Sequence, residues 1–194
     1  MKTNDSLEFA VLTGCMRISK ESIFIGLNNL KVLSVADMQF YEYFGFTDSE
    51  VRELLKYYEL FLNYGDVKEW YDGYRFGNVE VYCPWDAVNY CDELRADSNA
   101  LPQNYWSNTS SNEVVRKFIQ RADMGTTKNE IERLVAGEVI KKEIYQGLTY
   151  KDMYNSIDNI WSILFTTGYL TQRGKPERKA FIWKFPIWRS VRSL

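Results

Sequence analysis

The sequence of 194 residues contains no histidine and only three cysteines. Without histidine the chain cannot build a Ser-His-Asp triad, a Cys-His pair or histidine acid–base chemistry. Cys15, Cys83 and Cys91 are an odd number without a C-x-x-C pair, so free buried thiols are expected and a zinc site is not. Any catalysis would depend on carboxylates, lysines, tyrosines or a bound metal.

Long apolar runs are also absent. No run approaches the roughly 20 residues that a membrane-spanning helix requires, and residues 1–6 lack the apolar core of a signal peptide. We therefore expect a cytoplasmic protein without a membrane partner. The composition, 45% hydrophobic and 26% charged, fits a globular chain with one sizeable core or two small domains.

Positive charge is concentrated near the C-terminus. Residues 173–194 hold seven basic residues and one acidic residue, whereas the preceding 172 residues hold 17 basic and 25 acidic ones. Such a basic end either contacts a polyanion or docks on an acidic domain of the same assembly. The candidate nucleic-acid contacts are Arg173, Lys175, Arg178 and Lys179.

The start of the chain has the pattern of a buried sheet. Residues 7–12 form an almost continuous apolar run that Thr13 and Gly14 end, which predicts a strand of a parallel sheet, and residues 31–35 could pair beside it. Two strands are too few for such a sheet, so this segment is interpreted as the end of an α/β domain. At the carboxyl end of a parallel strand, Thr13 and the following Arg17 could contact a phosphate; the alternative is that they only end the strand and cap a helix.

Helix signals dominate the middle of the chain. Capping-box patterns at Thr47–Glu50, Ser110–Glu113 and Thr127–Glu130 predict three helix starts. Pro84 at a first helical position predicts another helix, through about Leu94.

The last fifty residues predict a different arrangement. Residues 139–144 are expected to form a strand, 149–152 a helix start, and 159–167 an apolar helix closed by Gly168. A basic turn over 173–177 and a strand over 179–185 follow. Helix, strand, turn and strand form the ending of a winged-helix domain. The expected fold class is therefore α+β and predominantly helical: a remnant of a parallel α/β sheet, a helical lid and a winged-helix-like β-hairpin ending.

The segment Trp70–Gly77 combines four aromatic residues with one acid, one base and two glycines. This mixture is too aromatic for an ordinary loop and too rich in glycine for a helix interior. One interpretation is a packed turn whose rings are buried against the capping-box helices. The other is a surface that presents Trp70, Asp72, Tyr74 and Arg75 to a ligand or a neighbouring domain. The sequence leaves both open.

Neither of two catalytic sequence patterns predicts a catalytic residue or a metal site in this chain. A phosphate-binding loop is absent, because Pro176 follows Gly174-Lys175 and cannot donate an amide hydrogen. A metal-dependent nuclease of the PD-(D/E)xK type would need Glu177-Arg178-Lys179 together with an upstream acid, for which Asp158 is the candidate. This pattern says little about how the three side chains would be arranged in space, so it is weak support for a nuclease site.

Several motifs together resemble a known family. They are Leu12–Phe24, Phe44–Thr47, Trp70–Gly77, Tyr82–Trp85, Tyr105–Ser110 and Leu164–Thr171. In this order they resemble the predicted AAA-ATPase-like family of bacterial P-loop proteins, from its last core strands to its winged-helix region. The segment Phe185–Trp188 departs from the pattern, because Trp188 stands where a polar residue is expected.

The resemblance implies that residues 1–40 end a P-loop-type core and that residues 41–194 form a helical lid and a winged-helix region. It places Thr13 as a nucleotide-sensing residue, followed by Arg17. It also implies that ATP and Mg²⁺ belong to a full-length member and that this chain alone has no cofactor and is not an enzyme. The implied partner is an adjoining P-loop core or nuclease-like domain.

Three hypotheses follow. The first is a lid and winged-helix portion of a nucleotide-switch protein. The second is a nucleic-acid-binding winged-helix module, which is less favoured because the predicted helices show no basic recognition face. The third is a truncated nuclease of the PD-(D/E)xK type.

Overall fold

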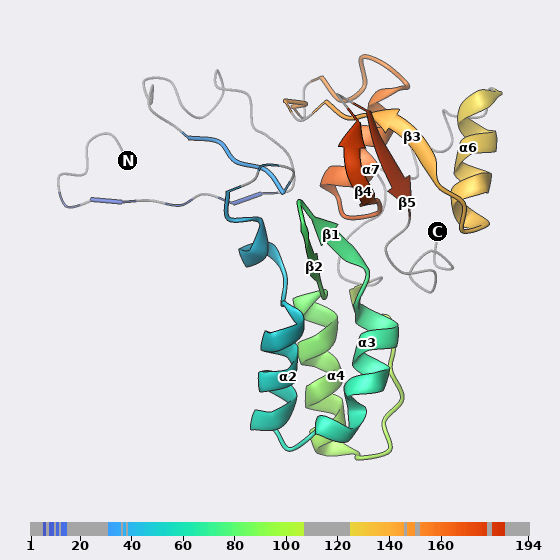
Figure 1. Cartoon of the computed structure of the whole chain (residues 1–194). Coiled ribbons are helices and arrows are strands. Elements are labelled where there is room, and N and C mark those ends of the chain that lie inside the picture. Colours follow the sequence, from blue (N-terminus) through green and yellow to red (C-terminus); the bar gives the residue numbers. More distant parts are fainter. Residues whose placement is uncertain are drawn as a thin grey trace.

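The computed structural model describes residues 6, 8–9, 11, 13–14, 31–35, 37, 39–106, 125–145, 147–149, 152–177 and 180–184. This part of the chain contains helices and short strands, with most of the helices in the first half and most of the strands in the second (Figure 1). In chain order they are η1 (Tyr41–Phe44), α2 (Asp48–Tyr57), η2 (Phe61–Asn63), α3 (Tyr64–Tyr71), β1 (Tyr74–Phe76), β2 (Val79–Val81), α4 (Pro84–Ala96), α6 (Thr126–Val135), β3 (Ile140–Glu143), α7 (Asn159–Thr166), β4 (Thr171–Glu177) and β5 (Ala180–Lys184). The fold is mixed α+β.

The helical unit, residues 45–105, packs α2, α3 and α4 around one core, with the β1–β2 hairpin at one end (Figure 1). The predicted capping box starts α2: the Glu50 amide donates to Thr47 Oγ1 at 3.4 Å, and the Thr47 amide donates to Glu50 Oε2 at 2.8 Å. Pro84 begins α4 as predicted. The core residues are Val51, Leu55, Val67, Tyr71, Tyr82, Tyr90, Cys91 and Leu94.

The Trp70–Gly77 segment ends α3 and forms the first strand of the hairpin. Tyr71 is 1% exposed and packs in the same core as α2, while Trp70 is partly buried against that core. Gly77 turns the chain at a φ of 56°, and a Cβ there would lie 2.9 Å from the Tyr41 ring. A side chain at this position would therefore meet both backbone strain and a collision.

The C-terminal unit, residues 125–184, has a separate core. Its three strands are antiparallel in the order β3-β5-β4, with α6 and α7 packed beside them. The predicted apolar helix is α7, and Gly168 closes it at a φ of 82° as expected. The Tyr169 amide donates to the Leu164 carbonyl and the Gly168 amide to the Phe165 carbonyl, which is the Schellman pattern.

Three predicted boundaries are wrong. The α6 helix begins two residues early, because Gly125 takes a φ of 78° at the N-cap and leaves Thr126 and Thr127 already helical, so Thr127 caps nothing. Thr149 and Asp152 close a turn, in which the Thr149 hydroxyl donates to the Asp152 carboxylate at 2.6 Å. The predicted basic turn over 173–177 belongs to β4, where the register against β5 shifts and Gly174 has a φ of 73°. An irregularity in the β4–β5 register, and not a turn, accommodates that glycine.

The parallel sheet expected at the start of the chain is not shown. Of the residues described in 7–12, Phe9 is 81% exposed and Val11 is 72% exposed, and neither lies in a strand. Residues 31–35 are described without a strand, although Val35 packs against the C-terminal core. The capping box predicted at Ser110–Glu113 lies outside the described residues.

Candidate functional site

The two units meet at the four residues 168–171 that follow α7. The Tyr74 hydroxyl of β1 donates to the Gly168 carbonyl at 3.0 Å. The Arg75 amide donates to Thr171 Oγ1 at 2.7 Å, and the same hydroxyl donates to the Arg75 carbonyl at 3.4 Å. One completely buried threonine therefore satisfies both main-chain groups of a strand that lies 96 residues away in sequence.

Tyr105 and Trp106 connect the two cores from the other side. Tyr105 packs against the core of the helical unit, and Trp106 packs against the core of the C-terminal unit. The Trp106 ring lies edge-on to Tyr169, with the ring centres 5.2 Å apart. Two consecutive side chains therefore pack against two different cores. We call the contacts of Tyr74, Arg75, Tyr105 and Trp106 with residues 168–171 and with the two cores the joint.

Asp86 fixes the main chain within the joint. It lies in the first turn of α4, is 5% exposed, and accepts the Trp106 amide on Oδ1 at 2.9 Å. Burial raises the pKa of Asp86, while hydrogen bonds from the Cys83 thiol and the amides of Trp106 and Tyr105 partly oppose that rise. Burial also raises the pKa of Cys83 to about 12, so this thiol stays protonated and is not a nucleophile at neutral pH.

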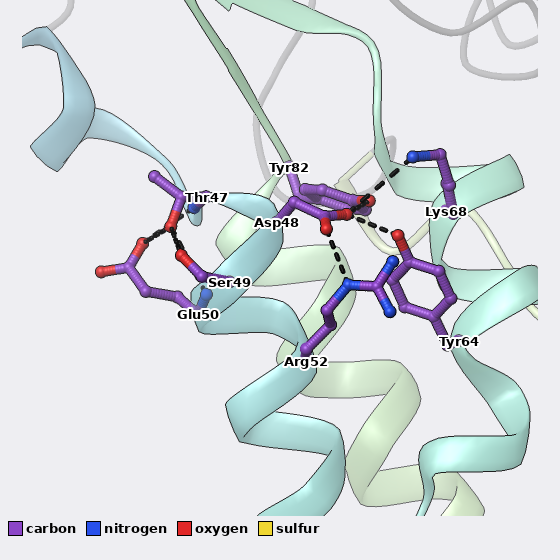
Figure 2. A network of polar contacts seen from close by, with 8 residues as sticks. All are labelled: Thr47, Asp48, Ser49, Glu50, Arg52, Tyr64, Lys68 and Tyr82. Carbon is purple, nitrogen blue, oxygen red and sulfur yellow. Dashed lines mark hydrogen bonds and ion pairs between the residues drawn. The ribbon is translucent and has the colours of Figure 1, made fainter.

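Asp48 is the centre of a second polar cluster, at the start of α2 (Figure 2). Its Oδ1 accepts the hydroxyls of Tyr64 at 2.5 Å and Tyr82 at 2.7 Å, and its Oδ2 accepts Arg52 Nε at 2.7 Å. Lys68 Nζ lies 3.9 Å from the same carboxylate. These donors hold the pKa of Asp48 well below its ordinary value. Because the carboxylate already accepts three hydrogen bonds from side chains of the protein, this cluster ties α2 to α3 and to the end of β2, and we do not treat it as a ligand site.

The residues predicted from the aromatic turn have distinct environments. Tyr74 and Arg75 belong to the joint, whereas Trp70 packs against the helical core. Asp72 ends α3 and is half-buried, and burial raises its pKa. The Arg75 guanidinium turns back on the hairpin, with Nε 3.3 Å from the Gly77 carbonyl and NH1 4.0 Å from Glu80.

The other predicted site residues do not come together in the part of the chain that the structure describes. Thr13 is exposed, and Arg17 lies outside the described residues, as do Arg178 and Lys179. Arg173 is exposed on β4, and Lys175 lies in the same strand. Asp158 is exposed just before α7, and Glu177 pairs with Ala180.

Two features of the described residues concern the requirements of a metal site and of a membrane-spanning helix. Within the described ranges, no group of three or more histidine, cysteine, aspartate or glutamate side chains could hold a metal ion. The same ranges contain no helix with the length and apolar character needed to cross a bilayer.

The residues that sequence reasoning missed are Asp48, Asp86 and Thr171. Asp48 stood inside the capping box but was not singled out, and its tyrosine partners lie 16 and 34 residues away. Asp86 follows Trp85 at the start of the Pro84 helix, where an acid is ordinary, so only its burial marks it as different. Thr171 carried no signal beyond its place at the end of the Leu164–Thr171 motif.

Neither a family model nor a solved structure matches the chain. Over 89 residues, 45% of its length, the chain is 34% identical to the uncharacterized protein in the vnfD 5' region of Azotobacter chroococcum mcd 1. The aligned segment is 17% of that protein, so the match spans about a sixth of a much longer relative. That relative's name assigns it no activity.

Proposed function

We propose that this chain is the lid and winged-helix region of an AAA-ATPase-like nucleotide-switch protein, with the role of transmitting the nucleotide state of an adjoining P-loop core. The observation that carries the proposal is the joint. Two units with separate cores contact each other through the short segment 168–171. Units of this kind can change their relative position without unfolding, which a nucleotide-driven switch requires.

The C-terminal unit supports the winged-helix part of the proposal. Its strand order is β3-β5-β4, and α7 precedes the β4–β5 hairpin, as the recognition helix precedes the wing in a winged-helix domain. In α7, however, the seven consecutive residues Asn159–Phe165 are buried. A helix covered in this way cannot place its side chains against base edges in a DNA groove. The winged helix is therefore proposed to contact protein.

The start of the chain could carry a conformational change from the adjoining P-loop core to the joint. By resemblance, residues 1–40 end the P-loop core, and Val35 in this segment packs against the C-terminal core. A displacement of that segment would reach the unit that holds residues 168–171. In this proposal Thr13 and Arg17 sense the nucleotide, ATP and Mg²⁺ are bound by the adjoining core, and the protein acts in the cytoplasm.

The chain alone is then expected to be neither an enzyme nor an ATP-binding protein. Titration calorimetry of the purified chain with Mg-ATP is expected to give no heat of binding, because no phosphate-binding loop stands in the sequence. Micromolar binding would contradict this proposal.

One observation favours nucleic acid as a second candidate ligand. Lys141, Ile182 and Arg173 form a row across β3, β5 and β4, and Lys141 and Arg173 are exposed. A titration with duplex DNA at about 150 mM salt, where charges are screened over roughly 8 Å, separates the candidates. We expect weak binding that replacement of Arg173, Lys175, Arg178 and Lys179 by glutamine does not change.

Tight, saturable DNA binding would favour the nucleic-acid module instead. The four replacements would then abolish that binding, and each lost phosphate contact would reduce the slope of log K against log salt by roughly 0.9. Lys56→Gln, an exposed change on α2 in the helical unit, is the matched control and should leave binding unaltered.

A further inference from the structure

The relative position of the two units depends on few contacts. The buried residues of the helical core and those of the C-terminal core form separate clusters. Between the clusters, the described contacts include the hydrogen bonds of β1 with residues 168–171, the packing of β1 beside β4, and the ring contact of Trp106 with Tyr169. The hydrogen bonds and the packing of β1 beside β4 can be lost while both cores stay packed, whereas the Trp106 contact belongs to the C-terminal core and stays in place.

Thr171 has the central position among these contacts. Arg75 pairs with Glu80 of β2 in the hairpin register, and its amide and carbonyl both contact the Thr171 hydroxyl. The hydroxyl therefore accepts from one main-chain group and donates to the other, as a neighbouring strand would. Thr171 itself begins β4, an edge strand of the three-stranded sheet.

We propose that the hydroxyls of Thr171 and Tyr74 together form a latch that holds β1 against residues 168–171, and that loss of either hydroxyl lets the C-terminal unit move as a rigid body. In the released state water can bond the hydroxyl and both main-chain groups of Arg75, so no polar group remains buried without a partner. The pivot is Tyr105-Trp106, where the Asp86 carboxylate keeps the Trp106 amide fixed to α4. This inference goes beyond the proposed function and holds or fails without any nucleotide.

The latch makes a matched pair of substitutions informative. Thr171→Val keeps the shape of the side chain but removes the hydroxyl, and Thr171→Ser keeps the hydroxyl. Hydrogen exchange of the whole chain, followed amide by amide, is the first measurement. We expect the Arg75 amide to exchange at least about fivefold faster in Thr171→Val, by loss of one hydrogen bond, and at nearly the parent rate in Thr171→Ser.

Residual dipolar couplings are the second measurement. In the parent and in Thr171→Ser the couplings of both units should fit one alignment tensor, whereas in Thr171→Val each unit should need its own. Unchanged Arg75 exchange and a single tensor in Thr171→Val would overturn the proposal. So would faster exchange spread through α7 and the sheet, because Thr171 would then only stabilise the C-terminal core.

A second variant covers the case in which Thr171→Val does not fold. Tyr74→Phe removes the hydroxyl that donates to the Gly168 carbonyl at 3.0 Å and leaves Thr171 intact. We expect it to separate the alignment tensors in the same direction. A single tensor in Tyr74→Phe would overturn the latch.

Discussion

Asp48 and Asp86 show how position decides the behaviour of one residue type. Both lie in the first turn of a helix, where a negative charge is favourable. The Asp48 side chain is 46% exposed and receives hydrogen bonds from two tyrosines and an arginine, which lower its pKa. Asp86 is buried, and the loss of water raises its pKa. The two carboxylates should therefore give the protein opposite pH dependences.

Asp48→Asn tests the first of these dependences. Because the folded-state pKa of Asp48 lies below its ordinary value of 3.8, its ionised form stabilises the fold above that value. This stabilisation is lost as the pH falls through 3.8 and below. We expect the parent to melt at a higher temperature than Asp48→Asn at pH 7 and the difference to shrink in acid. Tyr82→Phe, which lacks one donor, should give a smaller change, and a difference independent of pH would contradict the account.

Asp86→Asn is expected to show the reverse. A folded-state pKa above 3.8 means that the folded protein holds this proton more firmly than the unfolded chain does. The parent should therefore lose stability relative to Asp86→Asn as the pH rises from 3.8 through the folded-state pKa. Asparagine keeps an oxygen for the Trp106 amide, so the comparison isolates the charge. Urea unfolding of both proteins across this pH range is the measurement, and a parent that gains relative stability as the pH rises would refute the argument.

At the scale of the elements, the strongest sequence signals were those that depend on a few neighbouring residues. The Thr47 capping box, Pro84 at the start of α4 and Gly168 after α7 are confirmed, because each is a local hydrogen-bond or φ requirement. Thr127 failed although its pattern is equally good. Gly125 takes a positive φ and becomes the N-cap two residues before Thr127, and a capping-box pattern does not take such a competing glycine into account.

Two glycine substitutions test this local reasoning. Gly168→Ala should lower the free energy of unfolding by roughly 1–2 kcal/mol, because a φ of 82° strains an L-residue. A steric collision is not the cause of this loss of stability, since the nearest atom to a Cβ at this position is 3.8 Å away. Gly65→Ala, in α3 with nothing within 4 Å, should instead stabilise by about 0.5–1 kcal/mol. Urea midpoints that shift in the same direction for both would disprove the explanation.

The aromatic turn is tested at Tyr71, which lies at the end of α3. Its hydroxyl donates to the Gln103 carbonyl and accepts the Gln103 amide, each at 3.1 Å. Tyr71→Phe should cost about 1–3 kcal/mol, since two main-chain groups lose their partner. Tyr71→Ala should cost about 3–5 kcal/mol by emptying the core, and more than Trp70→Ala because Trp70 is only partly buried. Equilibrium unfolding would contradict this if Trp70→Ala were the more damaging change.

At the scale of the whole molecule, the sequence predicted the α+β class and α7 followed by a hairpin, and it left open whether the chain forms one core or two. The hydrogen bonds of β1 in the joint connect residues 94 and 96 positions apart, which no periodicity or local motif specifies. The unusual composition of their segment marks Tyr74 and Arg75, but the sequence does not specify the partners of these two residues. In the sequence Thr171 is an ordinary strand residue, and only its contact with β1 in the folded protein distinguishes it.

The central claim is that these two units belong to a nucleotide switch whose P-loop core adjoins them. Reading the genomic DNA in frame upstream of the Met1 codon tests it most directly. The account predicts an uninterrupted reading frame that encodes Gly-x-x-x-x-Gly-Lys-Ser/Thr after a strand pattern and before a helix pattern. A stop codon in that frame with no such motif between it and Met1 would contradict the claim.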